Sequence, residues 1–260
     1  MANKKLVIKT VQFTELTDAQ WAIIAKKIDT GRKISKNLRR VINCILKVCR
    51  TGCQWRNIDE CYGPWQSVYY YFRKWTKNGI LDNILNDLVA KERVRQGKEA
   101  EATAGAIDSQ SIKKVAFIKL DSGIDGNKYV NGRKRFLVVD TLGLPLAIFV
   151  CAANLFDSVA GIELFPILDK SAKKLRLIYA DNGFRGQFMQ AAYWCKYEVE
   201  ITQKPPSQQG FIPQKGRWQV ERSFAWCNFY RRLSKEYEKT TESSVAFLQT
   251  AFISMILAKF

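Results

Sequence analysis

Hydrophobic residues recur at helical spacing along the first part of the chain. The spacing predicts a first helix that begins at a Thr17–Gln20 capping box and ends near Gly31. A second helix is expected from about Ser35 to Gly52. Two further helices follow over residues 64–77 and 80–95. Residues 1–13 form a basic lead-in, for which we expect a short strand or an arm.

The predicted helix at 64–77 is basic and carries interleaved aromatic residues. Three helices of this size, with a short turn between the last two, resemble a helix-turn-helix module in which residues 64–77 would be the recognition helix. Arg73, Lys74 and Lys77 would then contact DNA. A plain helical bundle that happens to be basic is the alternative. Residues 96–99 are typical of a linker, which divides the chain into a helical DNA-binding domain (1–97) and a second domain (98–260).

The pattern changes after residue 103, where short apolar runs alternate with amphipathic segments. These runs predict a mixed α/β sheet with flanking helices. The expected strands cover residues 104–108, 135–140, 144–152, 175–180 and 197–202. The expected helices cover residues 161–172, 188–195, 217–238 and 244–258.

The predicted helix at 217–238 places one carboxylate in a row of polar groups. At 100° per residue, Glu221 shares a face with Arg217, Asn228, Arg232 and Lys235. The simplest interpretation is an exposed Arg217–Glu221 pair, which would stabilise the helix by only about 0.2–0.5 kcal/mol. The positions of two other acids favour a functional role.

Asp108 and Asp181 each follow an apolar predicted strand directly. Sites in open α/β sheets form beyond the carboxyl ends of strands, so neighbouring strands would bring these carboxylates together, and Glu221 could supply a third. Each Asp alone is also an ordinary turn residue, and Asp-Asn-Gly at 181–183 is a strong turn signal. Asp140 is a competing candidate, but the Thr-Leu-Gly after it predicts a hairpin turn.

Three converging carboxylates need a cation to balance them. The chain has no histidine, so a metal would have to bind carboxylate oxygens, which suits Mg²⁺ or Mn²⁺. Two such ions could position a water and a phosphodiester for in-line attack.

The formal net charge of +18 points to a polyanionic partner, most simply nucleic acid. A ribosome-associated or merely very basic protein would show the same charge. The seven cysteines contain no Cys-x-x-Cys pair and are interpreted as reduced residues of a cytoplasmic protein. The spacing of Cys44, Cys49, Cys53 and Cys61 fits no zinc-finger pattern. The N-terminus lacks the apolar core of a signal peptide, and the apolar run at 244–258 is too short to span a bilayer.

Several stretches, taken in order, resemble the transposases of the insertion-sequence-five group. They are TGCQWRNI and GPWQSVYYYFRKW in the first half, then AIDSQSIK, DGNKYVNGRKRFLVVDTLGLPLAIFVCAAN, YADNGFRG and RWQVERSFAWCNFYRRLSKEYE. The resemblance implies a ribonuclease H-like catalytic domain with a DDE triad at Asp108, Asp181 and Glu221. It also implies cleavage at terminal inverted repeats that depends on Mg²⁺, with Mn²⁺ as substitute, followed by strand transfer. The expected partners are double-stranded DNA and further copies of the chain, as a homodimer or larger oligomer.

One position departs from the family pattern. The family often carries a basic residue seven positions after the triad Glu, and Asn228 stands there. Arg231, Arg232 and Lys235 lie nearby and could take over this phosphate contact. Further DNA contacts are expected from Arg133, Lys134, Arg135, Arg185, Arg217 and Arg222, each of which could equally be an ordinary solvated charge.

Two other functions are compatible with the same residues. The chain could be a cleavage-inactive DNA-binding repressor or remnant of such an enzyme, although a pure binder needs none of the three acids. A host nuclease or junction resolvase of the same fold is the other alternative. Short terminal inverted repeats around the gene would favour transposition.

Overall fold

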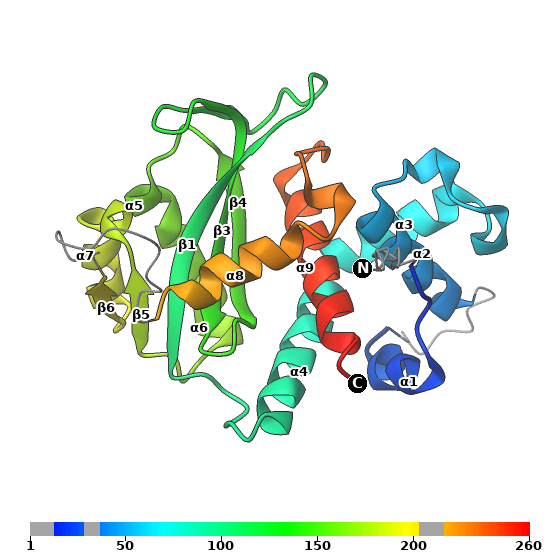
Figure 1. Ribbon diagram of the computed structural model, residues 1–260, viewed down its shortest axis with the longest axis horizontal. Coiled ribbons are helices and arrows are strands. Elements are labelled where there is room, and N and C mark those ends of the chain that lie inside the picture. Colours follow the sequence, from blue (N-terminus) through cyan, green and yellow to red (C-terminus); the bar gives the residue numbers. More distant parts are fainter. Residues whose placement is uncertain (1–12, 29–36, 203–215) are drawn as a thin grey trace, which may run out of the picture.

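The first half of the chain is helical in the computed structural model, which describes residues 13–28, 37–202 and 216–260. Its helices are α1 (Asp18–Ile28), α2 (Leu38–Thr51), α3 (Trp65–Lys77) and α4 (Ile80–Arg95) (Figure 1). The capping box is confirmed, because Thr17 Oγ1 accepts from Gln20 N at 3.2 Å and Gln20 Oε1 accepts from Thr17 N at 3.0 Å. The predicted lead-in at 1–12, the helix end at Gly31, the helix start at Ser35 and the loop at 203–215 lie outside the described residues.

The connection between α2 and α3 departs from a simple helix-turn-helix. It runs from residue 52 to 64 and includes two 3₁₀ turns, η1 (Trp55–Asn57) and η2 (Glu60–Tyr62). A helix-turn-helix has a turn of about 3–4 residues there. Helix α3 buries Val68, Phe72 and Trp75, as its spacing predicts. DNA recognition by α3 stays a prediction.

The second half contains a mixed sheet, which confirms the α/β class. Its strands are β1 (Ala104–Lys113), β2 (Gly123–Asp125), β3 (Val130–Asp140), β4 (Pro145–Ala152), β5 (Leu177–Ala180) and β6 (Glu198–Ile201). The order is β2-β3-β1-β5-β6, and β4 also pairs with β3. Strands β1, β3 and β4 are antiparallel, whereas β5 runs parallel to both β1 and β6.

Helices cover both faces of this sheet. Helix α8 (Trp218–Cys227) crosses β1 and β3 on one face (Figure 1). The other face carries α5 (Asp157–Ala160), η3 (Gly161–Leu164), α6 (Phe165–Ser171), η4 (Asn182–Phe184) and α7 (Gln187–Trp194). On this second face Phe136 contacts Phe184, which in turn contacts Phe188. Successive residues of β1 therefore face α8 and the α5–α7 layer alternately.

The C-terminal helix α9 (Thr241–Leu257) joins the two halves of the molecule. It packs against α2, α3 and α4 on one side and against β4 on the other (Figure 1). The buried apolar residues form one cluster that runs from α1 through the sheet to α9. The division at residues 97 and 98 into two domains stays a prediction.

The helix predicted at 217–238 is wrong beyond Cys227. The chain turns at Asn228, buries Tyr230, and forms a short 3₁₀ turn, η5 (Arg231–Leu233). It then runs beside the end of β1, where Glu236 N donates to Lys113 O at 2.9 Å. Tertiary pairing therefore overrides the helical pattern. Arg232 and Lys235, which lie beyond the end of α8, do not share the helical face of Glu221.

Candidate active site

Strands β1 and β5 bring Asp108 and Asp181 to the same edge of the sheet. The two strands are parallel neighbours, paired from Ala104–Leu177 to Ala106–Tyr179. Asp108 lies within β1 and not at its end, which corrects the expected strand boundary. Because the pairing with β5 stops at Ala106, Asp108 projects beyond β5, next to the turn that begins with Asp181.

Glu221 joins the two aspartates from α8, and Arg217 lies at the centre of the three acids. Arg217 Nη2 is 3.8 Å from Asp108 Oδ2, 3.5 Å from Asp181 Oδ2 and 3.8 Å from Glu221 Oε1. The exposed side-chain fraction rises from 17% at Asp108 to 34% at Asp181 and 45% at Glu221. Asp108 is thus the floor of an open site and Glu221 its rim.

Backbone N–H groups orient both aspartates. Ser109 N donates to Asp108 Oδ1 at 2.7 Å, and Gly183 N donates to Asp181 Oδ1 at 2.8 Å. Asp181 is the N-cap of η4, so it is a turn residue and an acid of the site together.

Burial raises the pKa of Asp108 to about 6. The Ser109 N–H and the Arg217 guanidinium favour the ionised form, whereas the negative charges of Asp181 and Glu221 oppose it. A cation that enters the site would therefore stabilise the ionised form of Asp108.

The donor set of the site suits a hard divalent cation. Within the part of the chain that the structure describes, no three His, Cys, Asp or Glu side chains lie close enough to hold one ion between them. The three acids instead surround a position that the Arg217 guanidinium fills. This open spacing fits Mg²⁺, which proteins usually hold by one or two carboxylates completed by waters and substrate phosphate.

The sequence matches two known families. Residues 16–85 match "Putative transposase of IS4/5 family", and residues 99–257, more than half of the chain, match "Transposase DDE domain". The chain belongs to the DDE transposases. This confirms the resemblance drawn from the sequence motifs.

Two curated relatives match parts of the transposase. A "Putative transposase for insertion sequence element IS402" from Burkholderia cepacia is 29% identical over 128 residues, which cover 45% of this chain and 59% of the relative. "Uncharacterized protein y4sN" from Sinorhizobium fredii is 30% identical over 74 residues, covering 27% of this chain and 59% of the relative. The matches thus span about three fifths of each relative's length.

Asp140, the competing acid, has a structural role in the transposase. Its Oδ1 accepts from Leu142 N at 2.9 Å and Leu144 N at 2.8 Å, which closes the β3–β4 hairpin. Its Oδ2 pairs with the buried Arg93 of α4. The predicted hairpin turn is confirmed, and Asp140 lies apart from the three acids.

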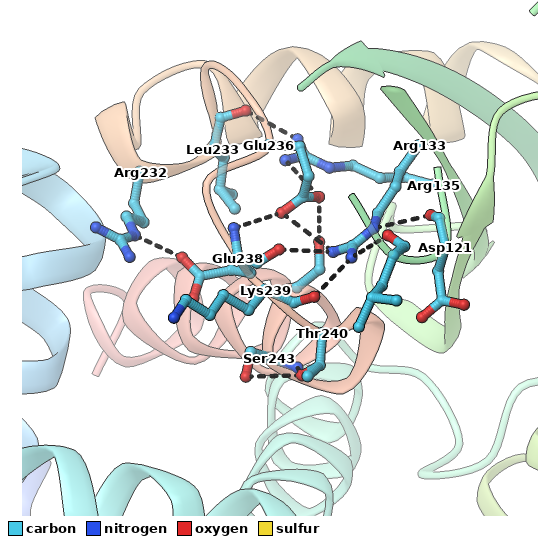
Figure 2. Close-up of polar contacts among 12 residues, drawn as sticks. Asp121, Arg133, Arg135, Arg232, Leu233, Glu236, Glu238, Lys239, Thr240 and Ser243 are labelled. Carbon is cyan, nitrogen blue, oxygen red and sulfur yellow. Dashed lines mark hydrogen bonds and ion pairs between the residues drawn. The ribbon is translucent and has the colours of Figure 1, made fainter. Parts of the chain in front are cut away.

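The expected basic patch at 133–135 is wrong, because these side chains are buried. Figure 2 shows Arg133 and Arg135 around Glu236. The Arg133 guanidinium donates to four backbone carbonyls, and Arg135 Nη1 donates to Leu233 O at 2.9 Å. Lys134 Nζ lies 2.8 Å from Asp157 Oδ1. Their polar atoms are committed to the fold and do not face DNA.

Two other predicted DNA contacts are also committed to the protein. The Arg222 guanidinium lies 4.2 Å from the Trp218 ring centre and 4.6 Å from that of Trp226, and it donates to Leu142 O. Arg232 Nε pairs with Glu238 at 2.7 Å (Figure 2). Neither group is free for a phosphate in this arrangement.

The remaining predicted contacts differ in exposure. Arg73 and Lys74 are half-buried on α3, and Arg73 Nη1 donates to Ser243 Oγ at 3.0 Å. The exposed ones are Lys77, Arg185, Arg231 and Lys235. DNA contact by these residues stays a prediction.

Metal binding by cysteine finds no support in the described residues. Cys44, Cys49, Cys53 and Cys61 are free, and they form no cluster of metal ligands. Over the same residues, no helix combines the length and apolar character needed to cross a membrane.

Proposed function

We propose that this transposase cuts DNA at the ends of an insertion sequence and joins the freed ends to target DNA. The observation that carries the proposal is the meeting of Asp108, Asp181 and Glu221 around one cation, the Arg217 guanidinium. These acids come from two adjacent parallel strands and a helix, and their donor atoms suit Mg²⁺ or Mn²⁺.

Each acid has a separate part in this proposal. Asp108 and Asp181, fixed by backbone N–H groups, would hold the cations jointly, and Glu221 would complete the coordination of one of them. A bound pair of Mg²⁺ ions would supply an activated water and stabilise the charge that develops on the phosphodiester. The new bond joins the water oxygen to phosphorus, and the 3′ oxygen leaves with a proton. That 3′ hydroxyl then attacks a target phosphodiester at the same site: its oxygen bonds to phosphorus, and the 3′ oxygen of the target strand leaves with a proton.

The strand arrangement supports a ribonuclease H-like catalytic domain. Three antiparallel strands are followed by two parallel ones, with the acids on β1, after β5 and on α8. We further propose that the transposase works as a homodimer or larger oligomer, because two transposon ends have to be paired, and that it acts on DNA in the cytoplasm.

Arg217 would act as the counter-ion of the acids until metal binds, and then turn to a DNA phosphate. Arg217→Gln removes this competing charge, so we expect Mn²⁺ to bind about tenfold more tightly, equivalent to about 1.4 kcal/mol. Titration of Mn²⁺ by electron paramagnetic resonance without DNA measures this. Arg185→Gln removes the same charge from an exposed position and should leave the affinity unchanged. Equal affinities of the wild type and Arg217→Gln would refute the counter-ion role.

The pKa of Asp108 predicts how stability depends on pH in metal-free buffer. Since the folded-state pKa of about 6 exceeds the ordinary value of 3.8, the folded protein binds this proton more tightly than the unfolded chain does. This stabilisation is complete below about pH 4 and is lost as the pH rises to about 6, a change of roughly 2–3 kcal/mol. Urea unfolding across this range measures it. Asp108→Asn should lack this pH-dependent stabilisation. If the free energy of unfolding changed equally with pH in both proteins, the raised pKa would not belong to Asp108.

The direct test of the proposed function uses labelled duplexes from both genomic flanks of the gene. We expect cleavage at the ends in Mg²⁺ or Mn²⁺ and none in EDTA. A protein that shifts these duplexes in a gel but never cuts them in Mn²⁺ would instead be a cleavage-inactive DNA-binding remnant. Cutting of any DNA, with no preference for the ends, would indicate a host nuclease.

A further inference from the structure

A fourth carboxylate, Asp157, lies beside the three acids on the opposite face of β1. It is the first residue of α5, in the stretch between the strand predicted at 144–152 and the helix predicted at 161–172. Asp157 Oδ2 accepts from Ser109 Oγ at 2.9 Å. The same oxygen packs against Gly183, where an added Cβ would lie 3.3 Å from it and 3.0 Å from Asp181 Oδ1.

These two contacts reach the residues that orient the aspartates. Ser109 supplies the N–H that holds Asp108, and Gly183 supplies the N–H that holds Asp181. A single oxygen of Asp157 therefore accepts from the Ser109 side chain and lies beside Gly183, the two residues whose N–H groups hold the carboxylates. A Cβ at position 183 would press on the carboxylates of both Asp157 and Asp181, which would have to shift to make room for it.

Lys134 fixes Asp157 from the other side. Lys134 Nζ lies 2.8 Å from Asp157 Oδ1, as an ion pair outside hydrogen-bond geometry, and donates to Leu155 O at 2.8 Å. The lysine side chain is only 8% exposed, so it has no access to DNA. Its charge balances that of Asp157, which keeps a fourth acid from adding unpaired negative charge to the site.

We propose that Asp157 is a positioning residue, which with Ser109 and Lys134 sets the placement of the Asp108 and Asp181 carboxylates for metal binding. This role rests on the proposed function, because it assigns those carboxylates to divalent cations. Asp157 acts through its neighbours and is not itself a metal ligand. Residues that orient metal ligands in this way typically contribute about 10–100-fold to metal affinity or activity.

The test measures Mn²⁺ affinity and the number of bound ions by electron paramagnetic resonance on the full chain without DNA. Asp157→Asn keeps an acceptor for Ser109 but removes the charge that holds Lys134, and we expect about tenfold weaker binding with the same number of ions. Ser109→Ala keeps the ion pair but removes the hydroxyl, and binding should weaken in the same direction. Ser109→Ala also keeps the test decisive if Asp157→Asn fails to fold.

Ser171→Ala is the control for the loss of a hydroxyl. Ser171 lies on α6, and its hydroxyl donates to Leu146 O at 2.7 Å and Ile167 O at 2.9 Å. Ser111 is unsuitable as a control, because its partner Asp125 lies 3.9 Å from Lys134 Nζ. The Mn²⁺ affinity of Ser171→Ala should equal that of the wild type. Wild-type affinity in the folded Asp157→Asn and Ser109→Ala variants, loss of one bound ion, or equal weakening in Ser171→Ala would each overturn the positioning role. A wild type that binds Mn²⁺ but never cuts DNA would overturn the proposed function instead.

Discussion

Replacing Asp108 with asparagine is expected to slow strand cleavage by about 10²–10³-fold, the effect of removing one preorganised electrostatic group from an active site. The amide keeps the size of the side chain and an acceptor for Ser109 N, but it removes the charge that would hold a cation at the floor of the site. Single-turnover cleavage of labelled transposon ends in Mn²⁺ measures the loss. Gel-shift affinity for the same DNA should be unchanged, because the DNA contacts that we propose come from other residues.

Asp169→Asn provides the matched comparison for this variant. Asp169 is an exposed aspartate on α6 that accepts a hydrogen bond from the Tyr197 hydroxyl at 2.7 Å, away from the three acids. Its cleavage rate should equal the wild-type rate. If Asp108→Asn also cleaved at the wild-type rate, Asp108 would have no place in the mechanism.

Replacing Arg133 with methionine is expected to lower the free energy of unfolding by about 3–5 kcal/mol, as when one partner of a buried ion pair is removed. The Arg133 side chain is 0% exposed and lies 3.7 Å from the buried Glu236. Its guanidinium donates to the carbonyls of Leu120, Asp121, Glu238 and Lys239 (Figure 2). Methionine leaves the four carbonyls without this donor and removes one of the two buried arginines beside Glu236. Urea denaturation in metal-free buffer measures the change.

Arg231→Met is the control for the loss of an arginine. Arg231 is exposed on η5, close in sequence to the same network, and its replacement should change stability by no more than about 0.5 kcal/mol. Equal and small effects of both substitutions would show that the Arg133 network does not support the fold.

Local pattern predicted much of the fold. Helix α4 spans Ile80–Arg95 as its apolar spacing predicts, and the capping box at Thr17 starts α1. Strands β4 and β5 lie close to their predicted positions because each coincides with a short apolar run. These features depend on neighbours in sequence, and so they can be recognised without the structure.

Partners distant in the sequence explain the errors. Nothing in the sequence near Arg133 and Arg135 indicates that carbonyls and a carboxylate from residues 233–239 bury both guanidinium groups. A distant partner also explains why the predicted helix at 217–238 ends early, because the backbone of Glu236 pairs with the polar end of β1. That end, from Ser109 to Lys113, lacks an apolar run, and its strand structure depends on pairing with β3.

The convergence of the three acids follows from the predicted positions of β1, β5 and α8. Two other features of the site do not follow from these predicted positions. The Arg217–Glu221 spacing predicts an ion pair but not the contacts of Arg217 with Asp108 and Asp181. Asp157 has no sequence signal of its own, because its partners Ser109, Lys134 and Gly183 lie on three separate elements.

The most direct test of the central claim replaces the expected Mg²⁺ with Fe²⁺ and uses ascorbate and peroxide to cut the backbone beside the bound ion. Since Asp108, Asp181 and Glu221 surround one position, ions bound there should produce fragments that end near all three residues. Excess Mg²⁺ should suppress these fragments, and Asp108→Asn should lose them. Fragments confined to one of the three positions, or cuts elsewhere in the chain, would contradict a shared metal site.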